Sequence, residues 1–358
     1  MDYKQTLMYR EIGETPKILQ SIAEKNAPVM EKLTAAIRAA KPGTVVGAAR
    51  GTSDHALIFF KYLTEILTPY RVALSAPGVF TVYGGKSDYT GSLVIGVSQS
   101  GKAADVLEVL RTANRQGALT LAVTNDQTSP MAKEAAYHLY CACGEEKSVA
   151  ATKTFSAQLF LLGWLTAELA GADALRAQLK TLGAELDPKM AGFEKNAGAA
   201  AEFLQAYRGG FVLSRGISYA LALETALKLQ ETSYLRMSGY AYSDFQHGPM
   251  AMLDAHTPVV FLAPSLGFAD AAREDAHTAE VSAVLEKIKS CGAPLLILTD
   301  RDGYDAYGKT LYIEKTGSEA LSVFRLALTV QLTACRLSCA IGNNPDAPRA
   351  LKKVTITR

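Results

Sequence analysis

The stretch from Leu93 to Arg111, LVIGVSQSGKAADVLEVLR, is the feature that most constrains the fold of this chain. It begins with a β-branched run typical of a buried parallel strand, passes through a turn of small hydroxyl and amide residues, and becomes helical from about Ala103. Gly101 lets the backbone approach a ligand, and a helix N-terminus leaves N–H groups unpaired, so this arrangement predicts a phosphate site. A loop of helix-capping serines is the alternative for a lone SQSG motif.

A second turn of the same type occurs earlier in the chain. The residues Arg50-Gly51-Thr52-Ser53 follow the strand-like segment TVVGA and precede an apolar helical segment. In an open parallel sheet, the carboxyl ends of the strands meet at one edge, where such folds bind small molecules. We therefore expect both turns to converge on one ligand, with Ser98, Gln99 and Ser100 adding side-chain donors.

The chain also contains an internal duplication. Arg215-Gly216-Ile217-Ser218 echoes the Arg50 turn. Ala263, which directly follows a strand-like segment over 259–262, lies as far after Arg215 as Ser98 lies after Arg50. Each half is thus expected to be a small doubly wound α/β unit. Where the first copy has SQSG, the second has Ala263-Pro264-Ser265-Leu266, whose proline lacks a backbone donor. We expect only the first half to hold a phosphate.

The predicted fold class is α/β, with two tandem doubly wound (flavodoxin-like) subdomains whose parallel sheets are flanked by helices. Five segments are expected in chain order: an N-terminal helical segment (1–28), a phosphate-binding domain (29–175), a helical connector (176–205), a second domain with the candidate catalytic residues (206–345) and a C-terminal active-site tail (346–358). Within the first segment, Thr15-Pro16 is typical of a helix start, and 29–40 predicts a second helix.

Two features of the second half suggest chemistry. The helix expected over 221–234 is largely apolar, yet Glu224, Lys228 and Glu231 fall within one narrow stripe, which suggests that the stripe faces an enclosed space. An ordinary surface ion pair is the alternative, because such pairs are common and weak. Further on, Gly-Pro follows His247 and places it in a turn, where a histidine is either merely exposed or suited to acid/base catalysis at neutral pH.

Composition argues against several classes of partner. The net charge is +2 from 37 basic and 35 acidic residues without a basic tract, so neither nucleic acid nor a membrane surface is expected as a partner. The polar N-terminus and the interrupted apolar run at 159–171 argue against a signal peptide or membrane span, which predicts a cytoplasmic protein. The five cysteines have no CxxC pair or clustered histidines, so we expect reduced thiols and no metal.

Six motifs occur together in one order: RGTSDHA, SQSG, EEKSVAATK, ALETALKLQETSY, FQHGPMAML and PRALKKVTIT. Over nearly the whole chain, from Arg10 onward, they resemble the double-SIS (sugar isomerase) family, specifically the isomerase half of glucosamine-6-phosphate synthase. The synthase also has an N-terminal glutaminase domain with a cysteine directly after the initiator methionine, whereas this chain has Asp2 and no room for that domain. It resembles more closely the stand-alone SIS-type glucosamine-6-phosphate deaminases.

The resemblance implies catalytic roles for particular residues. Glu231 matches the family's enolisation base, His247 its ring-opening histidine, and Lys353 its C-terminal active-site lysine. Glu224 and Lys228 match the accompanying residues of the catalytic helix. These roles agree with the chemistry, because an amino sugar phosphate must be ring-opened before a carboxylate can move a proton between neighbouring carbons.

The resemblance also implies a substrate site, with departures from the family pattern. Lys102 stands where the family has an acidic residue, Ala103 where it has a phosphate-binding threonine, and Ala151 where the synthase has a serine. The lysine places a positive charge near the phosphate, where it is expected to offset the lost donor. The implied phosphate-binding residues are Ser53, Ser98, Gln99, Ser100 and Lys102, and the further substrate-binding residues are Gly51, Thr52, Glu146, Val149 and Ala151.

The implied activity is conversion of glucosamine 6-phosphate to fructose 6-phosphate and ammonia, or the related ammonia-dependent aldose–ketose isomerisation, without a cofactor. One alternative is a fructosamine-6-phosphate deglycase. Another, of a different class, is a non-catalytic sugar-phosphate sensor, which would have no physical need for the three candidate catalytic residues. The resemblance also implies a homodimer with shared active sites, in which His247 completes the site that contains the partner's Glu231, and the apolar segment 237–242 is suited to crossing the interface.

Overall fold

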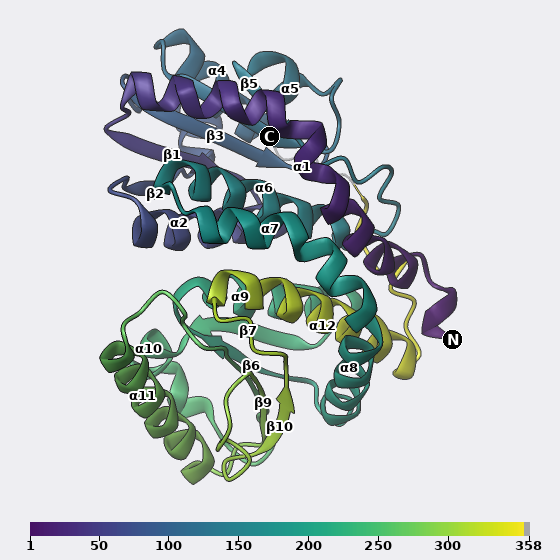
Figure 1. Cartoon of the computed structure of the whole chain (residues 1–358). Coiled ribbons are helices and arrows are strands. Elements are labelled where there is room, and N and C mark those ends of the chain that lie inside the picture. Colours follow the sequence, from purple (N-terminus) through teal and green to yellow (C-terminus); the bar gives the residue numbers. More distant parts are fainter. Residues whose placement is uncertain (354–358) are drawn as a thin grey trace. The chain divides into compact units, whose positions relative to one another are not determined.

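The computed structural model describes residues 1–353, so residues 354–358 of the expected C-terminal tail lie outside the described part. The chain separates into two compact units. The first-half unit comprises Glu14–Lys147, Ala151–Asp187 and the described residues 351–353. The second-half unit comprises Met1–Gly13, Ser148–Ala150 and Pro188–Ala350. Each unit is built around one parallel sheet (Figure 1).

The sheet of the first-half unit has the strand order β2-β1-β3-β4-β5, all parallel. Val46 lies beside Val94 and Ile95 beside Leu121 in the register. The central strands are buried along nearly their whole length, as expected for parallel strands with helices on both faces. The strands are β1 (Thr44–Ala48), β2 (Val72–Leu74), β3 (Ser92–Ser98), β4 (Leu119–Thr124) and β5 (Tyr137–Tyr140).

Helices cover both faces of this sheet. On one face α2 and α6 pack against each other, and on the other the apolar side chains of α4 pack on β1, β3 and β4. The helices are α1 (Leu7–Ala40), α2 (Thr52–Leu67), α3 (Gly78–Thr81), α4 (Ala104–Arg115), α5 (Pro130–Glu134), α6 (Lys153–Ala170) and α7 (Asp173–Leu186).

The second-half unit repeats this plan. Its sheet has the order β10-β9-β8-β6-β7, again all parallel, so each sheet places its first two strands at one edge. The strands are β6 (Gly209–Ser214), β7 (Arg236–Ala241), β8 (Val259–Ala263), β9 (Leu295–Thr299) and β10 (Lys309–Tyr312). The helices are α8 (Met190–Leu204), α9 (Tyr219–Ser233), α10 (Tyr242–Phe245), α11 (Ala271–Ser290) and α12 (Glu319–Ala340), with short 3₁₀ turns at Tyr3–Gln5, Asp187–Lys189, Gly216–Ser218 and Pro249–Met252.

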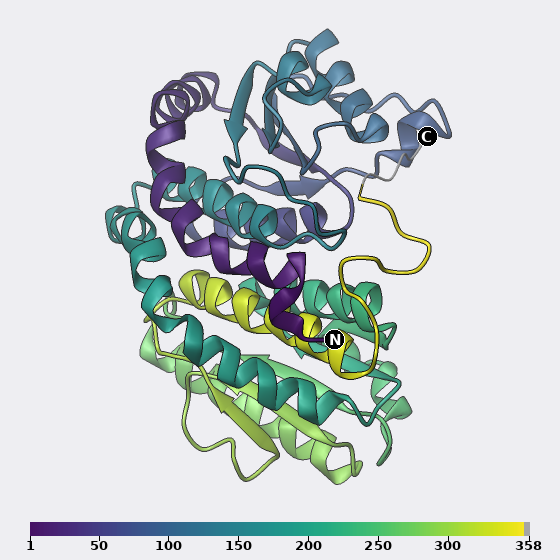
Figure 2. The same cartoon turned by 90° about the vertical axis from the view of Figure 1, so that its right-hand side faces the viewer.

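The two faces of the second sheet carry different helices. Phe211 and Leu213 of β6 point to the face where Tyr242, Phe245 and the apolar residues of α11 form one core cluster. Figures 1 and 2 show α9 and α12 on the opposite face, and these two helices pack against each other. The predicted fold of two duplicated doubly wound α/β subdomains is therefore confirmed.

The N-terminal helix differs from the prediction. Instead of a helix starting at Pro16 and another over 29–40, a single helix α1 runs from Leu7 to Ala40 with Pro16 and Pro28 inside it. An interior proline costs about 3 kcal/mol because it removes a backbone hydrogen bond and crowds the preceding turn. Side chains such as Leu19 and Ile22 are almost completely buried, and each contributes about 1.5–3 kcal/mol, so burial outweighs the proline signal.

The segment 237–242 also has a role other than the one expected. Arg236–Ala241 forms the edge strand β7, which pairs along its whole length with β6. Met237 and Tyr242 are buried within their own unit rather than presented as an apolar surface. The apolar and aromatic pattern is explained by this strand, because an edge strand still packs its side chains on both faces of the sheet.

Within residues 1–353, one helix is long and apolar enough to cross a membrane by length and composition. This helix is α12, and 94% of its most apolar window is buried inside the fold. Such burial is typical of a core helix in a large α/β unit.

Candidate active site

The SQSG turn has the geometry of an anion-binding turn. It joins the carboxyl end of β3 to α4, whose N-cap residue Ala103 contributes no side-chain cap. Gly101 adopts a left-handed φ of +64°, and a Cβ there would lie 2.2 Å from Ser129 Oγ, so no other residue fits without displacing its neighbours. The turn therefore depends on glycine because of its backbone conformation and the nearness of Ser129, whereas the predicted approach of the backbone to a ligand stays a prediction.

Ser53 lies in the neighbouring turn, in the first turn of α2. Gly51 precedes the helix with a φ of +53°, and both Thr52 and Ser53 are buried. Because β1 and β3 are adjacent parallel strands, the Ser53 turn and the SQSG turn follow the carboxyl ends of neighbouring strands. The strand order therefore places both turns at the same edge of the sheet, and their convergence on one ligand stays a prediction.

Three serine hydroxyls in these turns share one hydrogen-bonding pattern. Ser98 Oγ accepts the N–H of Gly101 at 3.2 Å, and Ser100 Oγ accepts the N–H of Lys102 at 3.3 Å. Ser53 Oγ accepts an N–H from the Gln158 side chain at 3.1 Å. Within the described residues, no acceptor takes the proton of any of these hydroxyls, so all three can donate to an anion.

The remaining residues of the SQSG turn face different partners. The carbonyl of Gln99 accepts the N–H of Asn125, which follows β4. Lys102, expected beside the phosphate, lies with its Nζ 3.6 Å from Asp126 Oδ2, and its side chain is 56% exposed. Its charge is thus shared with a carboxylate at the rim of the turn.

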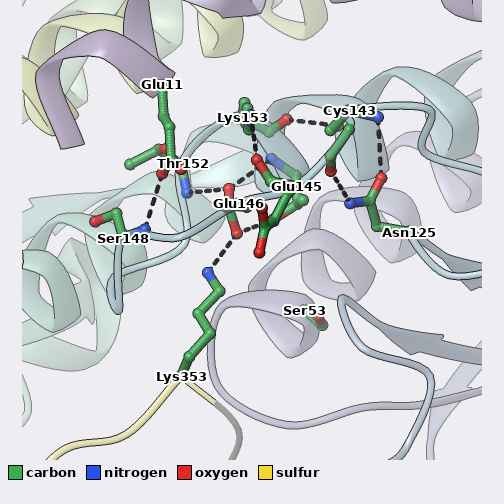
Figure 3. Close-up of polar contacts among 12 residues, drawn as sticks. Glu11, Ser53, Asn125, Cys143, Glu145, Glu146, Ser148, Thr152, Lys153 and Lys353 are labelled. Carbon is green, nitrogen blue, oxygen red and sulfur yellow. Dashed lines mark hydrogen bonds and ion pairs between the residues drawn. The ribbon is translucent and has the colours of Figure 1, made fainter. Parts of the chain in front are cut away.

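Glu146 organises the loop that enters α6 (Figure 3). Its carboxylate is fully buried and accepts the N–H groups of Thr152 and Thr154 at 3.0 and 3.1 Å and the Thr154 hydroxyl at 2.8 Å. Lys353 Nζ donates to the same carboxylate at 2.7 Å. The predicted tail lysine therefore reaches the loop motif of its own unit.

Burial by itself raises the pKa of Glu146, but the ion pair with Lys353 and the backbone hydrogen bonds outweigh it and hold the pKa below its ordinary value. Glu146 is thus an anion at neutral pH, and its lone pairs are engaged by four donors. Of the two other expected substrate contacts near this loop, Val149 lies in the second-half unit and Ala151 in the first-half unit, and both are half-buried.

In the second-half unit, the polar stripe of α9 forms a buried charge cluster. Lys228 Nζ lies 3.5 Å from Glu224 Oε1 and donates to Glu231. The side chains of Glu224 and Lys228 are 0% and 1% exposed, whereas that of Glu231 is 23% exposed. The alternative of an ordinary surface ion pair is therefore wrong, and Glu231 is the member of the cluster that solvent or a ligand can reach.

His247 lies in an exposed turn between α10 and the Pro249–Met252 turn, as predicted. Its backbone N–H donates to the carbonyl of Asp244 at 3.0 Å. α10 packs on the sheet face opposite to α9. The two residues expected to share catalysis therefore come from elements on opposite faces of the same sheet.

The turn at Gly216–Ser218, the counterpart of the Ser53 turn, is filled by a side chain of the protein itself. The carboxyl group of Glu319, the first residue of α12, is buried and accepts the N–H of Ser218 at 2.8 Å. Burial raises the pKa of Glu319 to about 7. In the counterpart of the SQSG turn, Asp300 accepts both the N–H and the hydroxyl of Ser265 at 2.7 and 2.9 Å.

These contacts identify residues that the sequence interpretation missed. Gln158 contacts Ser53, and Glu319 fills the second turn. Gln158 carried a signal, because it is a lone amide within a strongly apolar helix. Glu319 carried none, since a glutamate at the start of a helix is ordinary.

Among residues 1–353, no group of three or more His, Cys, Asp or Glu side chains is arranged to hold a metal ion. Cys141 and Cys143 are buried free thiols, and burial raises the pKa of both well above the ordinary value. Neither thiol is therefore poised as a nucleophile.

The duplicated doubly wound α/β fold defines the class of protein, and comparison with known families agrees. The SIS domain model matches residues 40–167 and 209–340, which span the two sheets. The chain belongs to the SIS domain family.

The chain is homologous to the isomerase half of glutamine–fructose-6-phosphate aminotransferase (isomerizing), which is another name for glucosamine-6-phosphate synthase. The enzyme of Thermococcus kodakarensis is 32% identical over 363 residues, which cover 98% of this chain and 58% of that protein. The enzyme of Caulobacter vibrioides is 32% identical over 369 residues, with the same two coverages. The chain thus spans about 58% of the length of these relatives.

Solved structures show the same fold. A proposed phosphosugar isomerase from Silicibacter pomeroyi DSS-3 is 31% identical, with a TM-score of 0.85 and coverage of 95% of this chain and 100% of that one. A glucosamine-6-phosphate deaminase from Thermotoga maritima shares the fold at 19% identity, with a TM-score of 0.75 over 98% of this chain and 100% of that one.

Proposed function

We propose that the protein converts glucosamine 6-phosphate and water to fructose 6-phosphate and ammonia, or runs the equivalent ammonia-dependent isomerisation on a related amino sugar phosphate. The observation that carries this proposal is the charge cluster of α9, in which Glu231 is partly exposed and Lys228 is buried. A carboxylate on a rigid helix beside a buried ammonium suits proton transfer next to a carbonyl, because the ammonium fixes its position. A sensor would need the anion-binding turns but not this cluster.

The reaction follows from the chemistry of the substrate. His247 moves a proton between the ring oxygen and the anomeric hydroxyl, which opens the sugar to its aldehyde. Glu231 then takes the proton from C2 while the C1 oxygen gains a proton, which gives an enaminol. Return of the proton to C1 and loss of one proton from the amine leave a primary alcohol at C1 and an imine at C2. Lys228 or Lys353 stabilises the negative charge that develops on oxygen during this transfer. Water adds to the C2 imine, and the resulting carbinolamine expels ammonia to form the ketone.

The phosphate of such a substrate suits the SQSG and Ser53 turns. Ser53, Ser98 and Ser100 have hydroxyl protons available for an anion, and the N-terminus of α4 has no side-chain cap. Hydrogen bonds from hydroxyls and helix N–H groups to a charged oxygen are stronger than those to a neutral one. These features favour a phosphorylated sugar over a neutral one.

The experiment that tests the function is a substrate panel. Purified protein is assayed for ammonia release and fructose 6-phosphate formation with glucosamine 6-phosphate and with fructose-amino-acid 6-phosphates, and for ammonia-dependent glucosamine 6-phosphate formation from fructose 6-phosphate. We expect turnover of glucosamine 6-phosphate in at least one direction. Cleavage of the fructose-amino-acid phosphates alone would replace the proposal with a deglycase, and phosphate binding without turnover of any substrate would favour a sensor.

We also propose that the active form is a homodimer in which the partner's His247 acts beside Glu231. The arrangement of the second sheet supports this, because α9 covers one face while α10, the helix directly before His247, packs on the other. A second copy supplies the histidine without requiring the chain to bring it around its own sheet. In a two-fold dimer such a contribution is reciprocal, so that each subunit supplies the histidine to the other's site.

A further inference from the structure

Among the described residues, three groups donate hydrogen bonds to the hydroxyls of Ser53, Ser98 and Ser100. Two are backbone N–H groups, and the third is the side chain of Gln158. It lies on α6, is 1% exposed, and is surrounded in sequence by apolar residues. Its Nε2 donates to Ser53 Oγ at 3.1 Å. Burying an amide in an apolar helix costs free energy unless the amide is hydrogen-bonded, and the hydrogen bond to Ser53 offsets part of that cost.

The direction of this hydrogen bond determines what Ser53 can do. A serine hydroxyl has one proton to donate and lone pairs to accept. An amide N–H that occupies a lone pair cannot take the hydroxyl proton, so the proton points elsewhere. Ser98 and Ser100 are held in the same donor state by backbone N–H groups, whereas for Ser53 a side chain performs this task.

The second half of the chain has a different residue at the position that corresponds to Gln158 when the two helices are counted from their first residues. Counted from the first residue of each helix, Gln158 of α6 corresponds to Phe324 of α12, which is buried and apolar. The corresponding turn is occupied by Glu319, whose carboxyl group accepts from Ser218. α12 has a buried amide of its own, Gln331, but it lies seven positions further along the helix than Phe324. By this count, the amide beside the turn is a feature of the first half.

We propose that Gln158 is a positioning residue that holds the Ser53 hydroxyl with its proton directed toward the phosphate of the substrate. The inference deepens the proposed function and rests on its phosphate site. Gln158 acts through Ser53 and not on the substrate, so its contribution must disappear when the hydroxyl is absent.

The test uses inorganic phosphate as the probe, measured by titration calorimetry on the full-length protein, together with KM and kcat for glucosamine 6-phosphate. Gln158→Met keeps the length of the side chain but removes the donor, and should weaken phosphate binding and raise KM by about three- to tenfold with kcat unchanged. Gln158→Glu presents only acceptors and takes the hydroxyl proton, so the loss should reach about tenfold or more. Neither change should weaken binding further in a Ser53→Ala background.

Ser156→Ala on the same buried helix is the matched control, and it should leave phosphate affinity unchanged. An equal loss from Gln158→Met with and without Ser53, or no loss in a folded variant, would overturn the proposal. If Gln158→Met fails to fold, Gln158→Glu and its double variant with Ser53→Ala decide the question in the same way. Phosphate affinities that respond as expected without turnover of glucosamine 6-phosphate would reject the proposed reaction and retain the role of Gln158.

Discussion

The two halves of the chain share a sheet topology but differ at the junction where the first strand of each sheet meets its helix. In the first half this turn presents the Ser53 hydroxyl, whose proton has no acceptor among the described residues. In the second half the Glu319 carboxyl occupies the turn and accepts the N–H of Ser218. In the second half, a carboxyl group of the protein accepts a hydrogen bond from the turn. In the first half, the hydroxyl donor of the turn remains available to an external anion.

The helices that follow these turns also differ, and here it is the second half that has the candidate functional side chains. Counted from the serine of each turn, the charged residues of α9 correspond to Phe59, Leu63 and Ile66 of α2, which are all apolar. The half with the open turn therefore has apolar side chains at these three helix positions, and the half with the occupied turn has the charge cluster there. Duplication supplied two scaffolds, and the residues suited to anion binding and to proton transfer are divided between them.

The largest expected effect comes from removing the proposed base. Glu231→Gln should lower kcat by about 10²–10⁴-fold, because a neutral amide cannot accept the substrate proton, while inorganic phosphate binding stays unchanged. Ile66→Gln, at the corresponding position of the first half, is the matched control and should retain activity. Steady-state kinetics measure both. A Glu231→Gln variant with near-normal kcat would show that the charge cluster of the second half does not supply the base for proton transfer.

Mixing inactive variants tests whether one site uses two chains. Glu231→Gln and His247→Ala proteins should each be nearly inactive, since each lacks one proposed acid/base group. Random subunit exchange gives half heterodimers with one intact site each, so about a quarter of the wild-type activity should return. Activity is measured after mixing and re-annealing, with exchange monitored by mass-tagged subunits. A mixture that stays inactive despite exchange would place both groups within one chain.

The buried carboxyls of the two halves should respond to pH in opposite directions. Burial raises the pKa of Glu319 from 4.5 to about 7, so its contribution to stability is complete below about pH 4.5 and is lost as the pH rises toward 7, about 3 kcal/mol in all. The pKa of Glu146 is lowered, so its contribution is present above about pH 4.5 and is lost as the pH falls through its folded-state pKa.

Urea unfolding at pH 5 and pH 7.5 measures this difference. Glu319→Gln should remove the loss of stability between these two pH values, because an amide does not ionise, whereas Glu146→Gln should leave that loss in place and destabilise the protein at both. The same pH dependence in the wild type and the Glu319→Gln variant would mean that Glu319 is ionised in the folded protein well below pH 7.

Removing single hydroxyls from the open turn should have a moderate effect. Ser98→Ala and Ser100→Ala should each raise KM for the phosphorylated sugar by an amount equivalent to about 1.5–3 kcal/mol, since each loses a hydrogen bond to a charged oxygen. Ser218→Ala in the occupied turn is the control and should leave KM unchanged. If KM responds to Ser218 and not to the first-half serines, the phosphate binds at the second-half turn.

The smallest effect is expected at Lys102. Its side chain is mostly exposed and lies near Asp126, so Lys102→Met should raise KM by only about two- to threefold. The increase should shrink at high salt, because exposed charges are screened. A large, salt-independent increase would indicate that the lysine leaves Asp126 and contacts the phosphate directly.

Much of the fold could be predicted because its signals are local. The strands around Val94 and Phe211 have the continuous apolar runs of buried parallel strands, and the recurrence of the Arg-Gly turn at Arg50 and Arg215 revealed the duplication. The helix start predicted at Pro16 was wrong, because tertiary burial, which local sequence does not report, outweighs a proline signal.

Only the parts of the candidate site that lie within recognisable sequence motifs could be predicted. The serines of the SQSG turn and the stripe of α9 could be located from sequence, and burial then distinguished the charge cluster from a surface ion pair. The contact between Gln158 and Ser53 and that between Glu319 and Ser218 join residues 105 and 101 positions apart. No periodicity or motif spacing encodes such pairs, since they depend on how two helices meet over a sheet.

Glu146 gives the end of the chain influence over the dynamics of a loop 207 positions upstream. The amides of Thr152 and Thr154 can exchange their hydrogens with solvent only when the carboxylate releases them. Without Lys353, that carboxylate would be a buried charge lacking its counter-ion, which is costly enough to favour opening of the loop. Loss of the segment that contains Lys353 should therefore accelerate hydrogen exchange at these amides, so that the order of this loop reports whether the ion pair is in place.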